Sequence, residues 1–230
     1  MRKILIMSPL LVLAAVTAVA QDSMKAAPDH CKVAFENDYV RVLRWTVPPG
    51  GKVEMHEHPA LVSVSLTSGK SRFTMADGET REAEIKAGQA TWSDPEKHAS
   101  ENLGSSPGHI IQVELKKAAG GDAATRRAVG TAGSPDPVTV DREHYTVEFE
   151  NDRVRVLRIR YGPNEKSVMH YHPRNVAVFL TDGQGQFTLP DGKKMDMAFK
   201  AGDVRWGDGE QHLPANAGTK PFELILVELR

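Results

Sequence analysis

Cysteine is almost absent from this sequence. Cys31 is the single cysteine in 230 residues, so the chain cannot form an internal disulfide framework or a cysteine-based zinc site. The thiol is left free, buried as a bystander, or available to link two chains. Basic residues are not in excess either: 29 Lys and Arg stand against 30 Asp and Glu. This balance excludes the electropositive surface that nucleic-acid binding requires.

Long hydrophobic runs are missing after the first twenty residues. The opening stretch "MRKILIMSPLLVLAAVTAVA" has two basic residues, an apolar run and a small-residue "AVA" end, which is the pattern of a secretory signal peptide. An uncleaved membrane anchor is the alternative, disfavoured because the run is short for a bilayer span. We therefore expect cleavage after residues 1–20 and a periplasmic or secreted protein with no membrane segment.

A convincing helical period is also missing from the rest of the chain. Short runs rich in β-branched and aromatic residues, such as "YVRVLRWTV" and "HIIQVEL", alternate with Gly and Asp-Gly turns. Short strands at this spacing predict an all-β protein, with a small barrel or jelly roll as the architecture.

The chain is one unit written twice. With an offset of 114 residues, "HCKVAFENDYVRVLR" aligns with "HYTVEFENDRVRVLR", and the match continues without a gap to the C-terminus with nearly half of the positions identical. We predict domains at residues 30–116 and 144–230, an N-terminal tail at 21–29, and a linker at 117–143 that is rich in Ala, Gly and Pro. Because each copy is near the lower size limit for an independent core, the two are expected to pack together.

The duplication also repeats the histidines. "MHEHP" in the first copy becomes "MHYHP" in the second, and a third histidine follows 40 residues later in each. Since residues i and i+2 of a strand share one face, the paired histidines present two imidazoles together, and the third can complete a metal site from a neighbouring strand. The predicted ligands are His56, His58 and His98 in one domain and His170, His172 and His212 in the other.

Other readings of these letters fit less well. "HEHPA" is not an HExxH zinc motif, because Ala60 stands where the second histidine would be. A single HxH would more often be a surface feature than a site, but its duplication together with a distant third histidine favours metal binding.

Acidic residues lie just before the third histidine of each copy. They are the weak catalytic candidates Asp94, Glu96, Asp208 and Glu210, in "WSDPEKH" and "WGDGEQH". If this stretch is extended, they face the cavity as a base or substitute ligand. Pro95, Gly207 and Gly209 instead favour a loop at the barrel mouth, which is the preferred interpretation.

Four repeated arginines form a further candidate group: Arg41, Arg44, Arg155 and Arg158. We expect them to form structural ion pairs, with Glu114 and Glu228 as partners, rather than a clamp for an anionic substrate.

At these residues the chain resembles the cupin superfamily, specifically a tandem-repeat bicupin. The first family motif, G-x5-H-x-H-x3,4-E-x6-G, is matched by Gly50, His56, His58 and Gly69, and in the second copy by His170, His172 and Gly183, with Asn164 in place of the opening glycine. The second motif is matched in looser form by Gly88, His98 and Asn102, and by Gly202, Gly209, His212 and Asn216. The resemblance implies two small jelly-roll barrels. Valine, Val62 and Val176, stands where most metal-binding cupins carry a glutamate ligand.

A three-histidine centre within this family resembles that of Fe(II) dioxygenases, which the resemblance makes the most specific expectation. The same ligands suit Zn, Cu, Ni or Mn, so a zinc-dependent isomerase, lyase or hydrolase remains open. A non-catalytic periplasmic module that binds metal or ligand is the main alternative, and division of labour between the copies is another. The expected partner is a small molecule; association into a homo-oligomer is left open.

Overall fold

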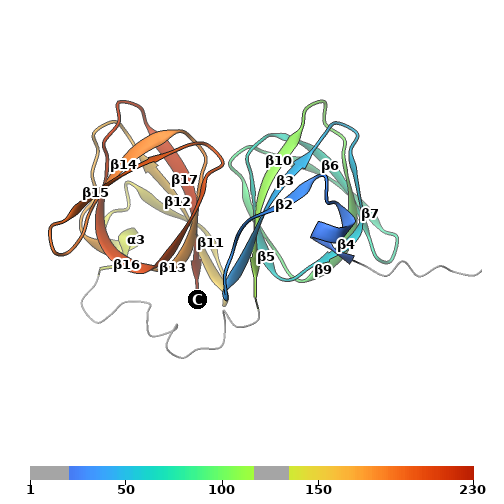
Figure 1. Cartoon of the computed structure of the whole chain (residues 1–230), viewed down its shortest axis with the longest axis horizontal. Coiled ribbons are helices and arrows are strands. Elements are labelled where there is room, and N and C mark those ends of the chain that lie inside the picture. Colours follow the sequence, from blue (N-terminus) through green and yellow to red (C-terminus); the bar gives the residue numbers. More distant parts are fainter. Residues whose placement is uncertain (1–20, 117–134) are drawn as a thin grey trace, which may run out of the picture.

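The structure, a computed structural model, describes residues 21–116 and 135–230. These residues form two β-barrels that lie side by side, each with one short helix against it, α1 (Ser23–Ala26) and α3 (Pro137–Val140) (Figure 1). The predicted signal peptide and residues 117–134 of the predicted linker lie outside the described residues. Within the described ranges, no helix is long and apolar enough to cross a membrane.

The first barrel is built from two five-stranded sheets. Their strand orders are β1-β4-β9-β6-β7 and β2-β3-β10-β5-β8, and only the pairing of β1 with β4 is parallel. The strands are β1 (Gln21–Asp22), β2 (Cys31–Glu36), β3 (Val40–Val47), β4 (Lys52–His58), β5 (Leu61–Ser65), β6 (Gly69–Met75), β7 (Thr80–Ile85), β8 (Ala90–Ser93), β9 (Glu96–Asn102) and β10 (Gly108–Leu115).

The second barrel is one seven-stranded sheet of order β11-β12-β17-β13-β16-β14-β15. The strands are β11 (Tyr145–Glu150), β12 (Val154–Tyr161), β13 (His170–Phe179), β14 (Gly183–Thr188), β15 (Lys194–Phe199), β16 (Val204–Asn216) and β17 (Phe222–Leu229). Strand β16 is continuous where Pro95 separates β8 from β9 in the first copy, because Gly209 takes the equivalent place with φ +92°. The prediction of an all-β chain with two jelly-roll domains is confirmed.

The strands between the barrels are buried on both faces. In β3, Val40 and Val42 face the other domain, whereas Trp45 and Val47 face their own barrel. Strand β17 does the same, with Val227 in the interface and its neighbours in the barrel. Burial on both sides explains why these strands read as nearly continuous apolar runs.

One hydrophobic core joins the two domains. It contains valines from equivalent positions of both copies, among them Val42 and Val156, which are fully buried. Trp206 of the second domain stacks on Phe35 and Tyr39 of the first, with ring centroids 6.0 and 5.8 Å apart. The predicted packing of one copy on the other is therefore present.

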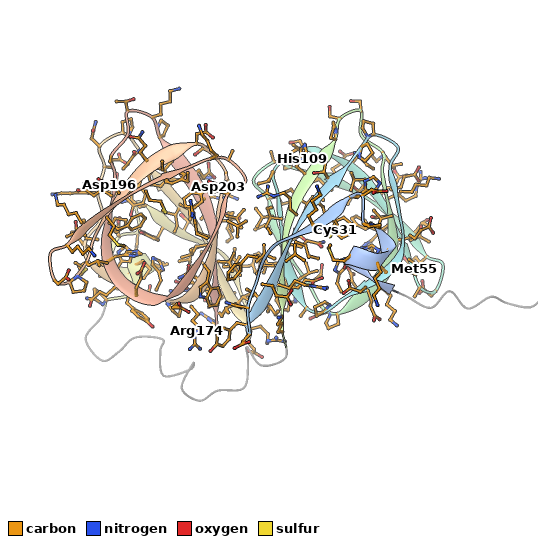
Figure 2. The ribbon with its side chains drawn as sticks, viewed as in Figure 1. Cys31, Met55, His109, Arg174, Asp196 and Asp203 are labelled. Atoms are coloured by element: carbon orange, nitrogen blue, oxygen red, sulfur yellow. The ribbon has the colours of Figure 1, made fainter. Side chains whose placement is uncertain are left out.

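Reciprocal hydrogen bonds show that the interface is pseudo-symmetric. Arg44 donates to the carbonyl of Gly202 across the interface, and the equivalent Arg158 donates to the carbonyl of Gly88, both at 2.6 Å. Such self-complementary pairing is what a two-fold axis imposes on identical subunits. Arg174 (Figure 2) adds a contact that the pseudo-symmetry does not repeat: its guanidinium lies 4.2 Å from the centroid of the Tyr39 ring.

The folded repeat begins earlier than the sequence predicts. Asp22 caps α1 and pairs with Arg41 at 2.8 Å; the equivalent Asp136 caps α3 and pairs with Arg155 at 2.6 Å. The predicted tail, residues 21–29, and the last residues of the predicted linker thus lie on the barrels. Little sequence identity marks these segments, because their role depends mainly on one capping aspartate.

Because the domains share a core, we predict that they unfold together. Ile225→Ala removes a fully buried side chain of this core and should lower the free energy of unfolding by about 2–5 kcal/mol. Calorimetry should show a single transition that moves as a whole. The control Val168→Ala alters an exposed side chain and should leave it in place. Two transitions, of which only one responds, would contradict the shared core.

Cys31 lies in the first barrel close to α1 (Figure 2), fully buried in a cluster with Ala27, Leu43 and Trp45. Burial raises the pKa of its thiol to about 12. We predict that iodoacetamide at pH 8 does not label Cys31 in the native protein but labels it in urea, as measured by intact mass. Rapid native labelling, or a covalent dimer without reductant, would instead favour the link between chains.

Candidate metal centres

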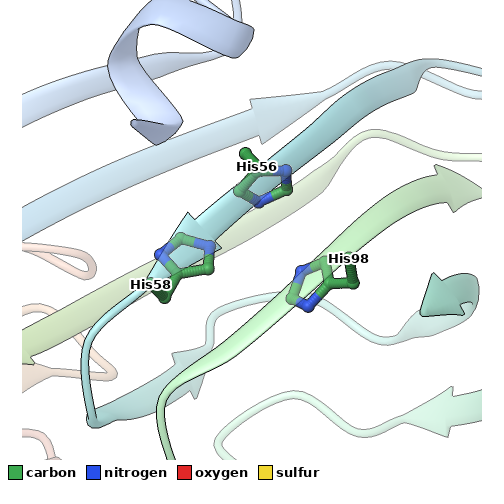
Figure 3. A group of neighbouring side chains, drawn as sticks. All are labelled: His56, His58 and His98. Atoms are coloured by element: carbon green, nitrogen blue, oxygen red, sulfur yellow. The ribbon is translucent and has the colours of Figure 1, made fainter. Parts of the chain in front are cut away.

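The histidines of the first copy meet across two neighbouring strands. His56 and His58 project from the same face of β4, and His98 on β9 is the cross-strand partner of His56 (Figure 3). All three are buried, and each offers a ring nitrogen within 4.8 Å of the others. The HxH spacing and the antiparallel register together produce this convergence.

The second copy repeats the arrangement. His170 and His172 lie on β13, and His212 on β16 pairs with His170. All three are buried, and the Nε2 atoms of His170 and His172 are 3.1 Å apart. The structure thus brings together the six predicted histidines as two groups of three.

The outer ring nitrogens have fixed acceptors. Nδ1 of His56 lies 2.7 Å from the carbonyl of Glu54, and Nδ1 of His170 lies 2.8 Å from the carbonyl of Val168. A carbonyl can only accept, so Nδ1 carries the proton in both rings and the Nε2 lone pair is free to bind a metal.

The second histidine of each HxH motif is hydrogen-bonded to a buried carboxylate. Nδ1 of His58 lies 2.8 Å from Glu114, and Nδ1 of His172 lies 2.7 Å from Glu228. A carboxylate behind a histidine fixes its tautomer and makes the inward nitrogen a better ligand. The sequence predicts only an ion-pairing role for these glutamates. Their second role depends on the position of β10 and β17 in the sheet, because β17 is paired with β13, the strand that carries the HxH motif in the second copy.

The predicted ion pairs are also present. Arg41 donates to Glu114 at 2.6 Å, and Arg155 donates to Glu228 at 2.5 Å. Each carboxylate is therefore shared between an arginine and a histidine. Arg44 and Arg158 serve the domain interface instead.

The donor set fits a divalent transition metal. Burial lowers the pKa of His56 to about 4 and of His170 to about 3, so both rings are neutral near pH 7. Nε2 of His58 is buried and has no hydrogen-bond partner, which is the state of a ligand atom turned toward a metal position. Three neutral imidazoles would hold the ion and leave its other positions open.

The acidic candidates divide into two pairs. Asp94 and Asp208 accept hydrogen bonds from the indoles of Trp92 and Trp206, at 3.1 and 2.7 Å, and are not brought to the histidines. Glu96 and Glu210 do approach, each with an oxygen 3.2 Å from Nδ1 of the third histidine. Each is therefore close enough to influence that ring, and Glu210 also lines the cavity beside the second centre. The preferred loop interpretation fails for β16, which is a continuous strand there.

The valines at the family's glutamate position point away from the centres. Val62 and Val176 are fully buried in the interdomain core. The inward face of β13 changes between His172 and Asn175, where Pro173 interrupts the regular pairing, so that Ala177 lines the cavity instead. Among the described residues, the groups around each centre contain three histidines and no carboxylate ligand.

We predict that the carboxylates behind the histidines strengthen metal binding. Glu114→Gln should weaken binding in the first domain by about 10- to 100-fold, because the amide is a poorer acceptor for the His58 proton. Competition with a chromogenic chelator measures the affinity. Glu57→Gln is the matched control: it lies between the two histidines in sequence but faces Lys97 outside the barrel. Equal effects of the two variants would contradict the assignment.

Comparison with known proteins agrees with this geometry. Residues 157–228 match the family model described as Cupin domain. AerE from Microcystis aeruginosa aligns with a TM-score of 0.63 at 12% identity, over 88% of this chain and 93% of that one. An oxalate decarboxylase from Bacillus subtilis aligns with a TM-score of 0.58 at 13% identity, over 84% and 69%. A cupin 2 conserved barrel domain protein from Leptotrichia buccalis gives 0.52 at 11% identity, over 87% and 88%.

No curated protein matches the chain. At these identities the solved structures establish the fold, and the family model covers most of the second copy, to which the first is related by the internal repeat. Residues 157–228 thus match the cupin family, and the chain has the fold of two cupin barrels in tandem, each with a three-histidine group suited to a metal ion.

Proposed function

We propose that this chain is an exported, metal-dependent enzyme that acts on a small molecule, with one divalent ion per domain. The observation that carries the proposal is the pair of buried three-histidine groups whose Nε2 atoms turn inward while their outer nitrogens are held. Export rests on the signal-like first twenty residues.

The ligand set favours chemistry at open metal positions. A divalent ion held by three neutral imidazoles keeps its full charge and can bind and polarise an oxygen-bearing substrate. Reaction with dioxygen at Fe(II) is the most specific form of the proposal. Zn, Mn, Cu and Ni suit the same ligands, since imidazole discriminates poorly among late divalent metals.

Oxalate is a substrate to test, because several of the similar solved structures are oxalate decarboxylases. The cavity beside the second centre does not favour so small a dianion. Arg205 is the one Lys or Arg among its described lining residues, and Asp196 and Glu210 lie there as well. A larger and less charged substrate fits this balance better.

A non-catalytic binding protein is the second candidate. The observation in its favour is that Asp94 and Asp208 accept hydrogen bonds from tryptophans and are not brought to the histidines. These two aspartates are therefore not positioned to act as a base at a bound ion.

Metal content tests the proposal first. We expect mass spectrometry of the mature protein, purified without chelator, to find about two transition-metal ions per chain. His56→Ala and His170→Ala should each remove one, because each disrupts one group. His109→Ala is the control, since His109 belongs to neither group and contacts Thr46.

Activity then separates the two candidates. Iron-loaded protein should consume oxygen with an aromatic or chelating substrate, and oxalate serves as a parallel assay. Metal-free protein with unchanged turnover would contradict the enzymatic proposal. Tight metal binding without turnover in any assay would favour the binding protein.

A further inference from the structure

The interiors of the two barrels differ far more than their histidines do. The second centre opens on a cavity of about 380 Å³, whereas the equivalent cavity of the first barrel measures about 70 Å³. The first histidine group borders a charged hollow on its outer side instead, lined by Arg41, Glu57, Glu96 and Lys97 among others. An apolar molecule of aromatic size therefore finds room in one domain only.

Two substitutions between the copies lie in the walls of these cavities. Trp45 fills the first barrel, with its indole nitrogen donating to Gln112 at 2.7 Å and its ring 5.6 Å from His56. The equivalent residues in the second barrel are Ile159 and Leu226, which are smaller or apolar and line the open cavity. Many of the other lining side chains are aromatic or thioether groups, including Phe179, Phe187, Met197 and Phe222.

The second barrel also carries a hydroxyl group at its centre. Tyr145 lines the cavity and is only 2% exposed, and its hydroxyl oxygen lies 3.1 Å from Nε2 of His170. Its oxygen is also 2.9 Å from that of Tyr161. The first barrel has Cys31 and Val47 at these two positions, so this pair of phenols is confined to the second domain.

The location of Tyr145 relative to His170 has a chemical consequence. Nε2 of His170 is the atom turned toward His172, so a bound metal would occupy its lone pair. The Tyr145 hydroxyl would then lose that acceptor and lie beside the open positions of the centre. When the Tyr161 hydroxyl donates to the Tyr145 oxygen, the Tyr145 proton is available to an oxygen atom of a ligand bound there.

We propose that the second domain alone takes the small-molecule ligand, an apolar molecule of aromatic size with an oxygen-bearing head. Its body lies in the cavity beside Ile159, and its head accepts a hydrogen bond from Tyr145 at the His170–His172–His212 group. The first domain binds metal but not this ligand. The position of the head rests on the proposed metal-dependent function, whereas the selectivity for one domain rests on the cavities.

The test uses 3-hydroxy-2-naphthoate, an aromatic chelator whose fluorescence reports binding, with metal content measured on the same sample. Full-length protein should bind one naphthoate per chain while holding two metal ions. Ile159→Trp should weaken naphthoate binding at least tenfold and leave two ions in place, whereas the size-conserving Ile159→Leu should bind as the parent does. Ala177→Leu narrows the same cavity from β13 and repeats the test if Ile159→Trp does not fold.

Tyr145→Phe tests the head contact. Loss of a hydrogen bond to a charged oxygen should weaken naphthoate binding by about 10- to 100-fold with unchanged metal content. Tyr171→Phe, which alters the tyrosine between the two histidines of the motif outside the cavity lining, should have no effect.

The outcomes separate this inference from the proposed function. Two naphthoates per chain, or one that persists in both Ile159→Trp and Ala177→Leu, would overturn the selectivity for the second domain. Unchanged affinity in Tyr145→Phe would overturn the head contact. Absence of metal from the purified protein would overturn the proposed function. In that case, weaker naphthoate binding by metal-free Ile159→Trp than by the metal-free parent would still support the cavity as the binding site for the apolar body.

Discussion

A buried carboxylate in the wall of each barrel is the constraint that ties the rest together. Glu114 and Glu228 are 1% exposed, and a charge so far from water requires close partners. An arginine from the paired strand β3 or β12 and a histidine from the HxH strand meet this need on different carboxylate oxygens. The register of three strands and the orientation of a metal-facing imidazole are thus parts of one arrangement.

The strands between the barrels have two structural roles, because one face of each packs in the interdomain core and the other lines a barrel. Residues of one parity on β3, β10, β12 and β17 form the interdomain core, and residues of the other parity face the barrels. A change on the inner face leaves the outer face intact. The interface could therefore keep matched valines such as Val42 and Val156 while Trp45 and Ile159 came to differ inside.

The fold and the histidine groups were predictable because both are periodic features. Alternating strands and the offset of 114 residues determine the architecture, and the HxH spacing identifies the face that bears the ligands. Asn164 follows the same logic: it replaces Gly50 in a turn and keeps φ positive, at +61° against +69°, a conformation that asparagine tolerates better than most residues.

The remaining features depend on tertiary structure that spacing does not encode. Counting along the motif places Val176 at the ligand position, but the interruption at Pro173 changes which face of β13 points inward. The second role of Glu228 required knowing that β17 lies beside β13. The difference between Trp45 and Ile159 is present in the aligned sequences of the two copies. Its consequence for the cavity depends on both side chains pointing into the barrels, which the sequence does not show.

The contrast between constant histidines and divergent interiors bears on what the first centre does. If metal binding mattered only for ligand turnover, a barrel filled by Trp45 would have no use for His56, His58 and His98 in a geometry matched to the second copy. An ion held between β4 and β9 stabilises the native barrel because the unfolded chain does not present the same site. On the proposed assignment, an ion in the first domain would stabilise its half of the shared core, and that core is continuous with the cavity-bearing half. The duplication would then separate the stabilising use of a metal from its chemical use.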